Sequence, residues 1–248
     1  GQLITKAHKV HHRLLVFGWN SRVPKVLEEL AQQPNIYFDV TLVSTASVAE
    51  REDALSEYLG PDWPGRTQCL QADYTEEAIQ REVNPESFHT VLLFSSDRLG
   101  TGEEADARSI VAFMMLDYLL SKVAKGRVRP HVLLELHDQS NEVYVRHSNN
   151  DVMVSSVIIS HILAQVALHP YLRSVYDDLL SSNGAHLSVR FLPEKLHREL
   201  AIAELQQYIL AEGGVLLGVN PTGKKVELNV RANERFTFGP ESQLIVIH

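Results

Sequence analysis

The sequence predicts an α/β fold built on a parallel sheet, because short apolar runs alternate with amphipathic, helix-like segments. The first pair shows the pattern: residues 14–17 are all apolar, Gly18 follows, and apolar residues recur at helical spacing over 23–30. A run that is apolar throughout suits a strand covered by helices on both faces. Gly18 allows a tight turn, and Asn20 or Ser21 is expected to cap the helix.

The same alternation continues along the chain. Further strands are expected at 40–44, 67–72, 90–94, 131–138 and 151–154, and helices at 48–59, 76–79 and 110–120. Helix 110–120 is apolar nearly all round, so we expect it to be buried against the sheet. Six strands with helical crossovers predict a Rossmann-like, doubly wound parallel sheet.

Two more apolar helices, 156–168 and 171–180, meet at Pro170 after this sheet is complete. They need a partner to bury them, and a second copy of the chain is the expected one. The apolar positions concerned are Ile158, Ile159, Ile162, Leu163 and Val166. His161 and His169 lie on this segment and are expected to be buried and hydrogen-bonded. From about Gly184 onward, strands near 186–192, 214–219, 225–230 and 243–247 with a helix inside 194–210 predict a small α+β lobe.

Composition narrows the class of protein. A formal net charge of −8 argues against a nucleic-acid-binding protein, which needs clustered Lys and Arg. The single cysteine, Cys69, excludes a disulfide framework and indicates a reducing compartment. Neither a signal peptide nor a membrane-spanning run is recognisable, so no direct membrane insertion is expected. The chain begins at Gly1 rather than Met, and we expect it to be a fragment of a longer protein.

The turn after the first strand lacks the nucleotide-binding pattern. A dinucleotide site would have G-x-G-x-x-G, whereas here Gly18 stands alone with Trp19 beside it. The next strand ends in Ser44 and Thr45 instead of an acidic residue. We therefore expect no bound nucleotide and no enzyme activity. Three alternatives remain open: a nucleotide-binding regulatory domain that uses Gly18, Asn20 and Asp73, a degenerate NAD-dependent dehydrogenase, or a structural element that binds no ligand.

The residues resemble a known family, the RCK domain (regulator of potassium conductance), and within it the CASTOR/POLLUX ion channels. The resemblance rests on Phe17-Gly18-Trp19-Asn20, Gln71-Ala72-Asp73, Leu134 to Asp138, Glu103 to Ser109 and Tyr171 to Leu180. It implies a ligand-sensing domain on the cytoplasmic face of a membrane. Dimers formed through residues 156–180 would assemble into the gating ring of a tetrameric channel, after a transmembrane pore domain. The order of the motifs is slightly more like the second such domain of a subunit.

The resemblance also implies a calcium site. Related potassium channels bind the ion through acidic residues after strand four and on strand five, and the matching positions are Asp97, Glu135, His137 and the adjacent Asp138. His137 weakens the inherited site because calcium prefers oxygen ligands. In the alternative interpretation, Asp97 caps a helix and Glu135 pairs with a nearby base.

Two other acidic groups have competing interpretations. Glu103, Glu104 and Asp106 are expected to stabilise a helix start, with Glu104 paired to Arg108, rather than bind a metal. Asp73 either faces a ligand or anchors the turn after its strand. The predicted organisation is a linker at 1–11, a Rossmann-like lobe at 12–155, a helical crossover at 156–183 and a C-terminal lobe at 184–248.

Overall fold

The computed structural model describes residues 10–33, 35–61, 63, 65–96, 102–123, 127–146, 151–181 and 184–248. The chain divides into two compact units, Gly1–Leu163 and Ala164–His248, and this boundary falls inside one helix. The predicted organisation at 12–155, 156–183 and 184–248 stays a prediction.

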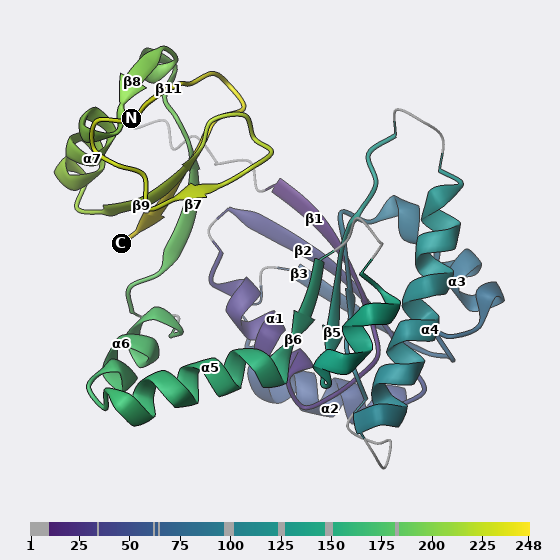
Figure 1. Cartoon of the computed structure of the whole chain (residues 1–248). Helices are drawn as coiled ribbons and strands as arrows, with labels where there is room; N and C mark the ends of the chain where they lie inside the picture. The colour runs from purple at the N-terminus through teal and green to yellow at the C-terminus, as the bar shows by residue number, and fades with distance from the viewer. Residues whose placement is uncertain are drawn as a thin grey trace, which may run out of the picture. The chain divides into compact units, whose positions relative to one another are not determined.

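The first unit is a parallel sheet of six strands in the order β3-β2-β1-β4-β5-β6 (Figure 1). Its strands are β1 Val10–Phe17, β2 Ile36–Ser44, β3 Gly65–Gln71, β4 Thr90–Leu93, β5 His131–Leu136 and β6 Asp151–Val154. Every neighbouring pair is parallel. The order reverses between β1 and β4, which confirms the predicted doubly wound, Rossmann-like fold.

Helices cover both faces of this sheet, which is why its central strands are apolar throughout (Figure 1). One face packs against α1 Val23–Ala31 and α2 Val48–Tyr58, with Leu14 and Val16 pointing toward them. The other face packs against α3 Glu77–Val83 and α4 Gly102–Ser121, with Leu15 and Phe17 pointing that way. Short 3-10 helices η1 Pro85–Ser87 and η2 Gln139–Tyr144 complete the connections.

Helix α4 is less buried than the sequence predicts. It buries Ala112, Phe113 and Leu116 against the sheet, but Val111, Met114 and Tyr118 are each at least half exposed. The helix is apolar all round in sequence, yet it has an outer apolar stripe that nothing in the first unit covers. Apolar composition therefore predicted more burial than a helix on an outer layer can have.

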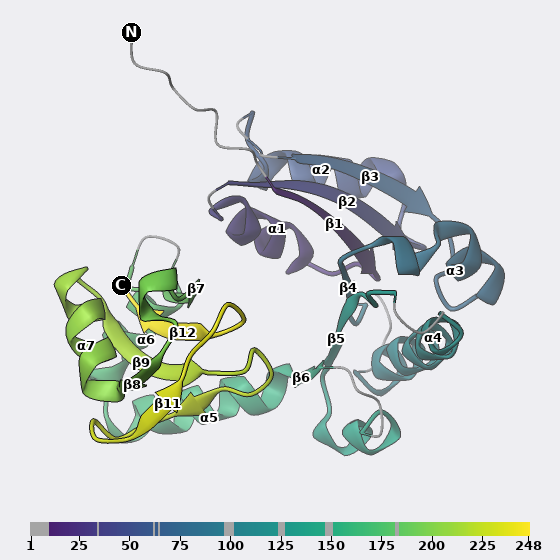
Figure 2. The ribbon, with the colours of Figure 1, turned by 90° about the horizontal axis from the view of Figure 1, so that it is seen from above.

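Helix α5 Ser155–Leu168 begins directly after β6 and leaves the sheet, and α6 Leu172–Leu179 follows (Figures 1 and 2). Neither helix contains a fully buried residue. His161 and His169 are exposed, so the expectation that both are buried was wrong. His161 lies on α5, which buries none of its residues, and His169 directly follows that helix.

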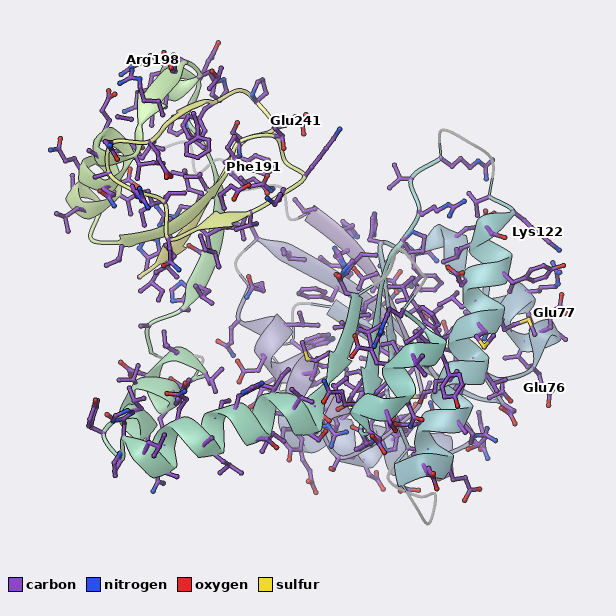
Figure 3. All side chains as sticks on the ribbon, in the orientation of Figure 1. Glu76, Glu77, Lys122, Phe191, Arg198 and Glu241 are labelled. Carbon is purple, nitrogen blue, oxygen red and sulfur yellow. The ribbon has the colours of Figure 1, made fainter. Side chains whose placement is uncertain are left out.

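The second unit contains a four-stranded antiparallel sheet in the order β10-β9-β12-β7. Its strands are β7 Leu187–Phe191, β9 Val215–Asn220, β10 Glu227–Leu228 and β12 Gln243–Ile247, and α7 Ile202–Ala211 packs on one face. On the other face Phe191, labelled in Figure 3, is 65% exposed. A small two-stranded sheet, β8 Glu199–Ala201 with β11 Arg235–Thr237, and the 3-10 helix η3 Glu194–Leu196 were not expected.

Candidate functional site

The carboxyl ends of β1, β4 and β5 meet at the point where the strand order reverses, which is where ligands bind in open α/β sheets. Gly18, at the end of β1, has φ +89° and lies against the end of β4. A Cβ atom built on Gly18 would stand 2.1 Å from the carbonyl oxygen of Phe94. The glycine is therefore required by the approach of two strands within the protein, without any ligand.

Asn20 connects the three strand ends from a buried position. Its Nδ2 donates to the carbonyl oxygen of Ser95 at 2.8 Å and lies 3.4 Å from Oε2 of Glu135, while its Oδ1 accepts from the Arg22 amide at 2.9 Å. The last of these bonds stabilises the turn before α1, whose first residue has no side-chain cap. Asn20, two residues before the N-cap position Arg22, thus holds the turn that precedes α1 and does not cap the helix.

Glu135 is paired within the chain. Its Oε1 lies 2.8 Å from Nη2 of Arg22, and only 11% of its side chain is exposed. A nearly buried carboxylate requires such compensation, because an unpaired charge loses its hydration. Of the two interpretations of Glu135, pairing with a nearby base is the one that the geometry fits.

Asp106 links α4 to the loop that follows β5. Its carboxylate accepts hydrogen bonds from the backbone amides of His137 and Asp138 and from Nδ2 of Asn141, each at 2.9 Å. Burial alone would raise the pKa of Asp106, but these hydrogen bonds hold that pKa below its ordinary value. Asp106 is fully buried and is therefore a structural anchor rather than a residue of an exposed acidic helix start.

Asp73 anchors the turn after β3. Its Oδ1 accepts from the amide and the hydroxyl of Thr75, at 2.9 and 2.6 Å, and lies 2.8 Å from Nη2 of Arg108. Partial burial opposes the charged form, yet these partners lower the pKa of Asp73. Arg108 also lies over the Tyr74 ring and is thus committed to Asp73, not to Glu104 as expected.

The three predicted calcium ligands that the structure describes, Glu135, His137 and Asp138, do not by themselves form a metal site. Asp97 lies outside the described residues. Asp138 accepts from the Ser140 amide at 2.8 Å and caps η2, and Nδ1 of His137 lies 3.4 Å from Asp106. Among the residues that the structure describes, no three His, Cys, Asp or Glu side chains are close enough to hold a metal ion. His137, Asp138 and His161 instead line an open hollow of about 770 Å³.

The predicted dimer residues on α5 form an apolar surface. Ile158, Ile159 and Leu163 are 42%, 56% and 63% exposed, and Ile162 and Val166 are half-buried. Ile158 and Ile159 also border an apolar pocket of about 320 Å³, whose lining includes Val26 of α1 together with Arg22 and Glu135. Sequence reasoning found α5 but missed the role of Arg22, because nothing in the local pattern pairs residues 22 and 135.

No protein-family model matches the chain. The probable ion channel SYM8 of Pisum sativum is 22% identical over 247 residues, which cover 92% of this chain and 27% of that protein. The probable ion channel POLLUX of Oryza sativa subsp. japonica is 24% identical over 191 residues, covering 75% of this chain and 19% of that protein. The chain thus spans about a quarter or less of the length of these curated relatives.

The solved structures include the human SLO3 gating ring, with a TM-score of 0.65 at 12% identity over 95% of this chain and 44% of that chain. At this identity the likeness concerns the fold. Among the described residues no helix has both the length and the apolar character needed to span a membrane. The chain is thus similar in sequence to the CASTOR and POLLUX ion channels over most of its length, and its fold is similar to that of a gating ring.

Proposed function

We propose that this chain is the cytosolic, non-catalytic regulatory domain of a CASTOR/POLLUX-like ion channel, part of a gating ring attached to a transmembrane pore. The observation that carries the proposal is that one stretch of sequence, 92% of the chain, matches channels while the same stretch has the fold of a gating ring. Ligand binding would shift the population of two ring conformations, and only a difference in affinity between them can move the pore.

Assembly through α5 is the part of the proposal with the most direct structural support. Ile159 and Leu163 are four residues apart, so they lie on one face of the helix, and both are more than half exposed. An apolar helix surface of this kind is unfavourable in water unless a partner covers it. We infer that a second copy covers it, because α5 carries this surface in every copy and a two-fold contact uses the same patch twice.

The identity of the ligand is a separate and more specific proposal. Calcium remains the candidate, with Glu135, His137 and Asp138 at the carboxyl end of β5 and Asp97 outside the described residues. Because the Arg22 guanidinium is paired with the Glu135 carboxylate, a calcium ion must displace Arg22 before it can bind Glu135. We therefore expect a response in the millimolar range of weak sites, not the micromolar range of calcium sensors.

The calcium proposal is tested by the melting midpoint of the chain as calcium is increased, with magnesium as the control, because a ligand that binds only the folded state stabilises it. We expect a calcium-specific rise that is absent in Glu135→Gln and occurs at lower concentration in Arg22→Gln. A midpoint that does not respond, or one that responds equally in Glu135→Gln, excludes a site built on Glu135.

The alternative function is a nucleotide-binding regulator or a degenerate dehydrogenase. The carbonyl oxygen of Phe94 occupies the space next to Gly18. The Trp19 side chain, only 7% exposed, is packed in the same turn, where a dinucleotide-binding protein needs space for the pyrophosphate. Equilibrium dialysis with NADH and ATP distinguishes the two functions. Retention of neither compound is expected, whereas saturable binding of one that is lost in Asn20→Ala would favour the alternative.

A further inference from the structure

The proposed function leaves an apolar pocket in the first unit without a role. The pocket has a volume of about 320 Å³ and lies on the sheet face that packs against α1 and α2. The strand register places Leu92 of β4 beside Leu133 of β5, and Glu135 of β5 beside Met153 of β6. All four residues line the pocket, so regular strand pairing fixes its floor.

Two helices complete the lining of this pocket. Val26 belongs to α1, and Ile158 and Ile159 belong to α5. Apart from one ion pair and one serine, all the lining residues are apolar. A cavity with such a lining holds water poorly and takes up apolar molecules. Ligand pockets in proteins measure about 300–1,000 Å³, so this pocket suits a small molecule.

The polar end of the pocket lies where ligands bind in open α/β sheets. Arg22 lies in the turn after β1, Phe94 directly follows β4, and Glu135 is near the end of β5. The strand order reverses between β1 and β4, and β5 is the next strand. The pocket therefore has an apolar body with a few polar groups at the ligand-binding edge, which is typical of small-molecule sites.

The ion pair at this end determines which charge a ligand can carry. Nη2 of Arg22 lies 2.8 Å from Oε1 of Glu135, so the two charges balance within the chain. Among the described residues that line the pocket, no other carries a charge. A charged ligand group would therefore find no free counter-charge. An unpaired charge next to the nearly buried Glu135 is unfavourable.

An uncharged ligand avoids this cost and keeps the ion pair intact. A guanidinium group has five N–H donors, and 44% of the Arg22 side chain is exposed. Arg22 can therefore donate to a neutral oxygen of a ligand while its Nη2 stays paired with Glu135. A hydroxyl or carbonyl oxygen is a sufficient acceptor for this hydrogen bond.

We propose that this pocket binds a small uncharged molecule with an apolar body and a single oxygen, the chemistry of an aliphatic alcohol or ketone. Leu92, Leu133 and Met153 contact the apolar body, and Arg22 donates to the oxygen. The site goes beyond the proposed calcium response and does not depend on it. The ligand uses the ion pair intact, whereas calcium must displace Arg22 from Glu135.

Fluorescence of N-phenylnaphthylamine, an uncharged probe whose emission rises in apolar surroundings, tests the site on the whole chain. We expect saturable binding and displacement of the probe by octanol. Octanoate and octylammonium have the same chain length and opposite charges, and we expect each to compete at least about tenfold less well at neutral pH. An absence of saturable binding, or a charged compound that competes as well as octanol, would overturn the proposal.

Variants that fill the pocket locate the site. Met153 is 45% exposed, so Met153→Trp adds a bulky side chain without disturbing a fully buried position, and Val26→Phe fills the pocket from α1. We expect each variant to be folded by circular dichroism and to bind the probe at least about tenfold more weakly. Met114→Trp is the matched control, because Met114 is 57% exposed on α4, which packs on the other sheet face. Equal binding by all three variants would contradict the site.

A side chain of a second copy is the competing occupant, because Ile159 borders both the pocket and the proposed association surface. Leu163 lies outside the pocket lining, so Leu163→Asp weakens association without changing the pocket. We expect the probe to bind this variant and the wild type equally. Binding confined to the variant would assign the pocket to the second copy and overturn the ligand proposal. Sedimentation velocity measures association separately, so failure of the proposed function and failure of this site are distinguishable.

Discussion

Arg22 and Glu135, 113 positions apart in the sequence, form an ion pair of 2.8 Å between the start of α1 and the end of β5. Glu135 is the more buried partner, and Asn20 holds its second oxygen. The residue that most resembles a calcium ligand in the sequence is therefore neutralised by a cation of the same chain. This pair connects the stability of the domain to any cation that competes with Arg22.

Removal of Arg22 should destabilise the domain. Arg22→Met leaves a nearly buried carboxylate without its cation, which we expect to lower the free energy of unfolding by about 1–3 kcal/mol, less than for a fully buried pair because Arg22 itself is 44% exposed. Urea denaturation measures the change. Arg173→Met is the matched control, because its pair with Asp177 is exposed and should contribute less than about 0.5 kcal/mol. Equal effects of the two substitutions would show that the burial of Glu135 does not strengthen its pair with Arg22.

Gly18 should tolerate no side chain. Gly18→Ala combines a positive φ with a Cβ atom 2.1 Å from a backbone oxygen, so we expect a loss of about 3 kcal/mol or more, or no folded protein. Gly60→Ala is the control, since no atom lies within 4 Å of its Cβ position. Circular dichroism during thermal unfolding compares the two. A Gly18→Ala protein as stable as Gly60→Ala would show that the backbones of β1 and β4 are not in close contact at Gly18.

Asp106 should make the domain sensitive to acid. Its pKa is lowered in the fold, so the stability it contributes is fully present above its ordinary pKa of about 3.9 and is lost as the pH falls through the lowered value. Asp106→Asn exchanges one acceptor oxygen for a donor facing backbone amides, and we expect a loss of about 2–4 kcal/mol at pH 7.

The same variant provides the pH control. Because Asn does not titrate, the difference in unfolding free energy between wild type and Asp106→Asn should shrink from pH 6 to pH 3. Urea titrations at the two pH values measure it. A difference that is constant with pH would mean that the carboxylate charge of Asp106 contributes nothing to the anchor.

The regular elements of this protein could be predicted from local patterns, because a strand covered on both faces is apolar throughout and its helices repeat every three to four residues. All six parallel strands and the α5–α6 corner follow from such patterns. The short strands β8 and β11 were missed because three residues are too few to show an alternation. The resemblance to channels came from the order of motifs and not from any single one.

The site was harder to predict because its partners are distant in sequence. The sequence predicts Glu135 as a site residue but does not reveal its partner. Arg22 lies in the turn after the first strand, and the local pattern of that turn bears only on nucleotide binding. Asp106 was grouped with Glu103 and Glu104 by proximity, although helical geometry turns it inward to the His137 and Asp138 amides. Side-chain direction, which separates neighbours on a helix, depends on packing that the sequence does not state locally.

Self-association through α5 is the most direct test of the proposed gating-ring domain, and sedimentation velocity measures it. The account predicts that the wild-type chain sediments as a dimer or larger species. The double variant Ile159→Asp/Leu163→Asp should sediment as a folded monomer with an unchanged circular-dichroism spectrum, because both side chains are exposed in a single copy. Leu210→Asp, equally exposed but on α7, should leave the association intact. A monomeric wild type, or a double variant that associates normally, would contradict the account.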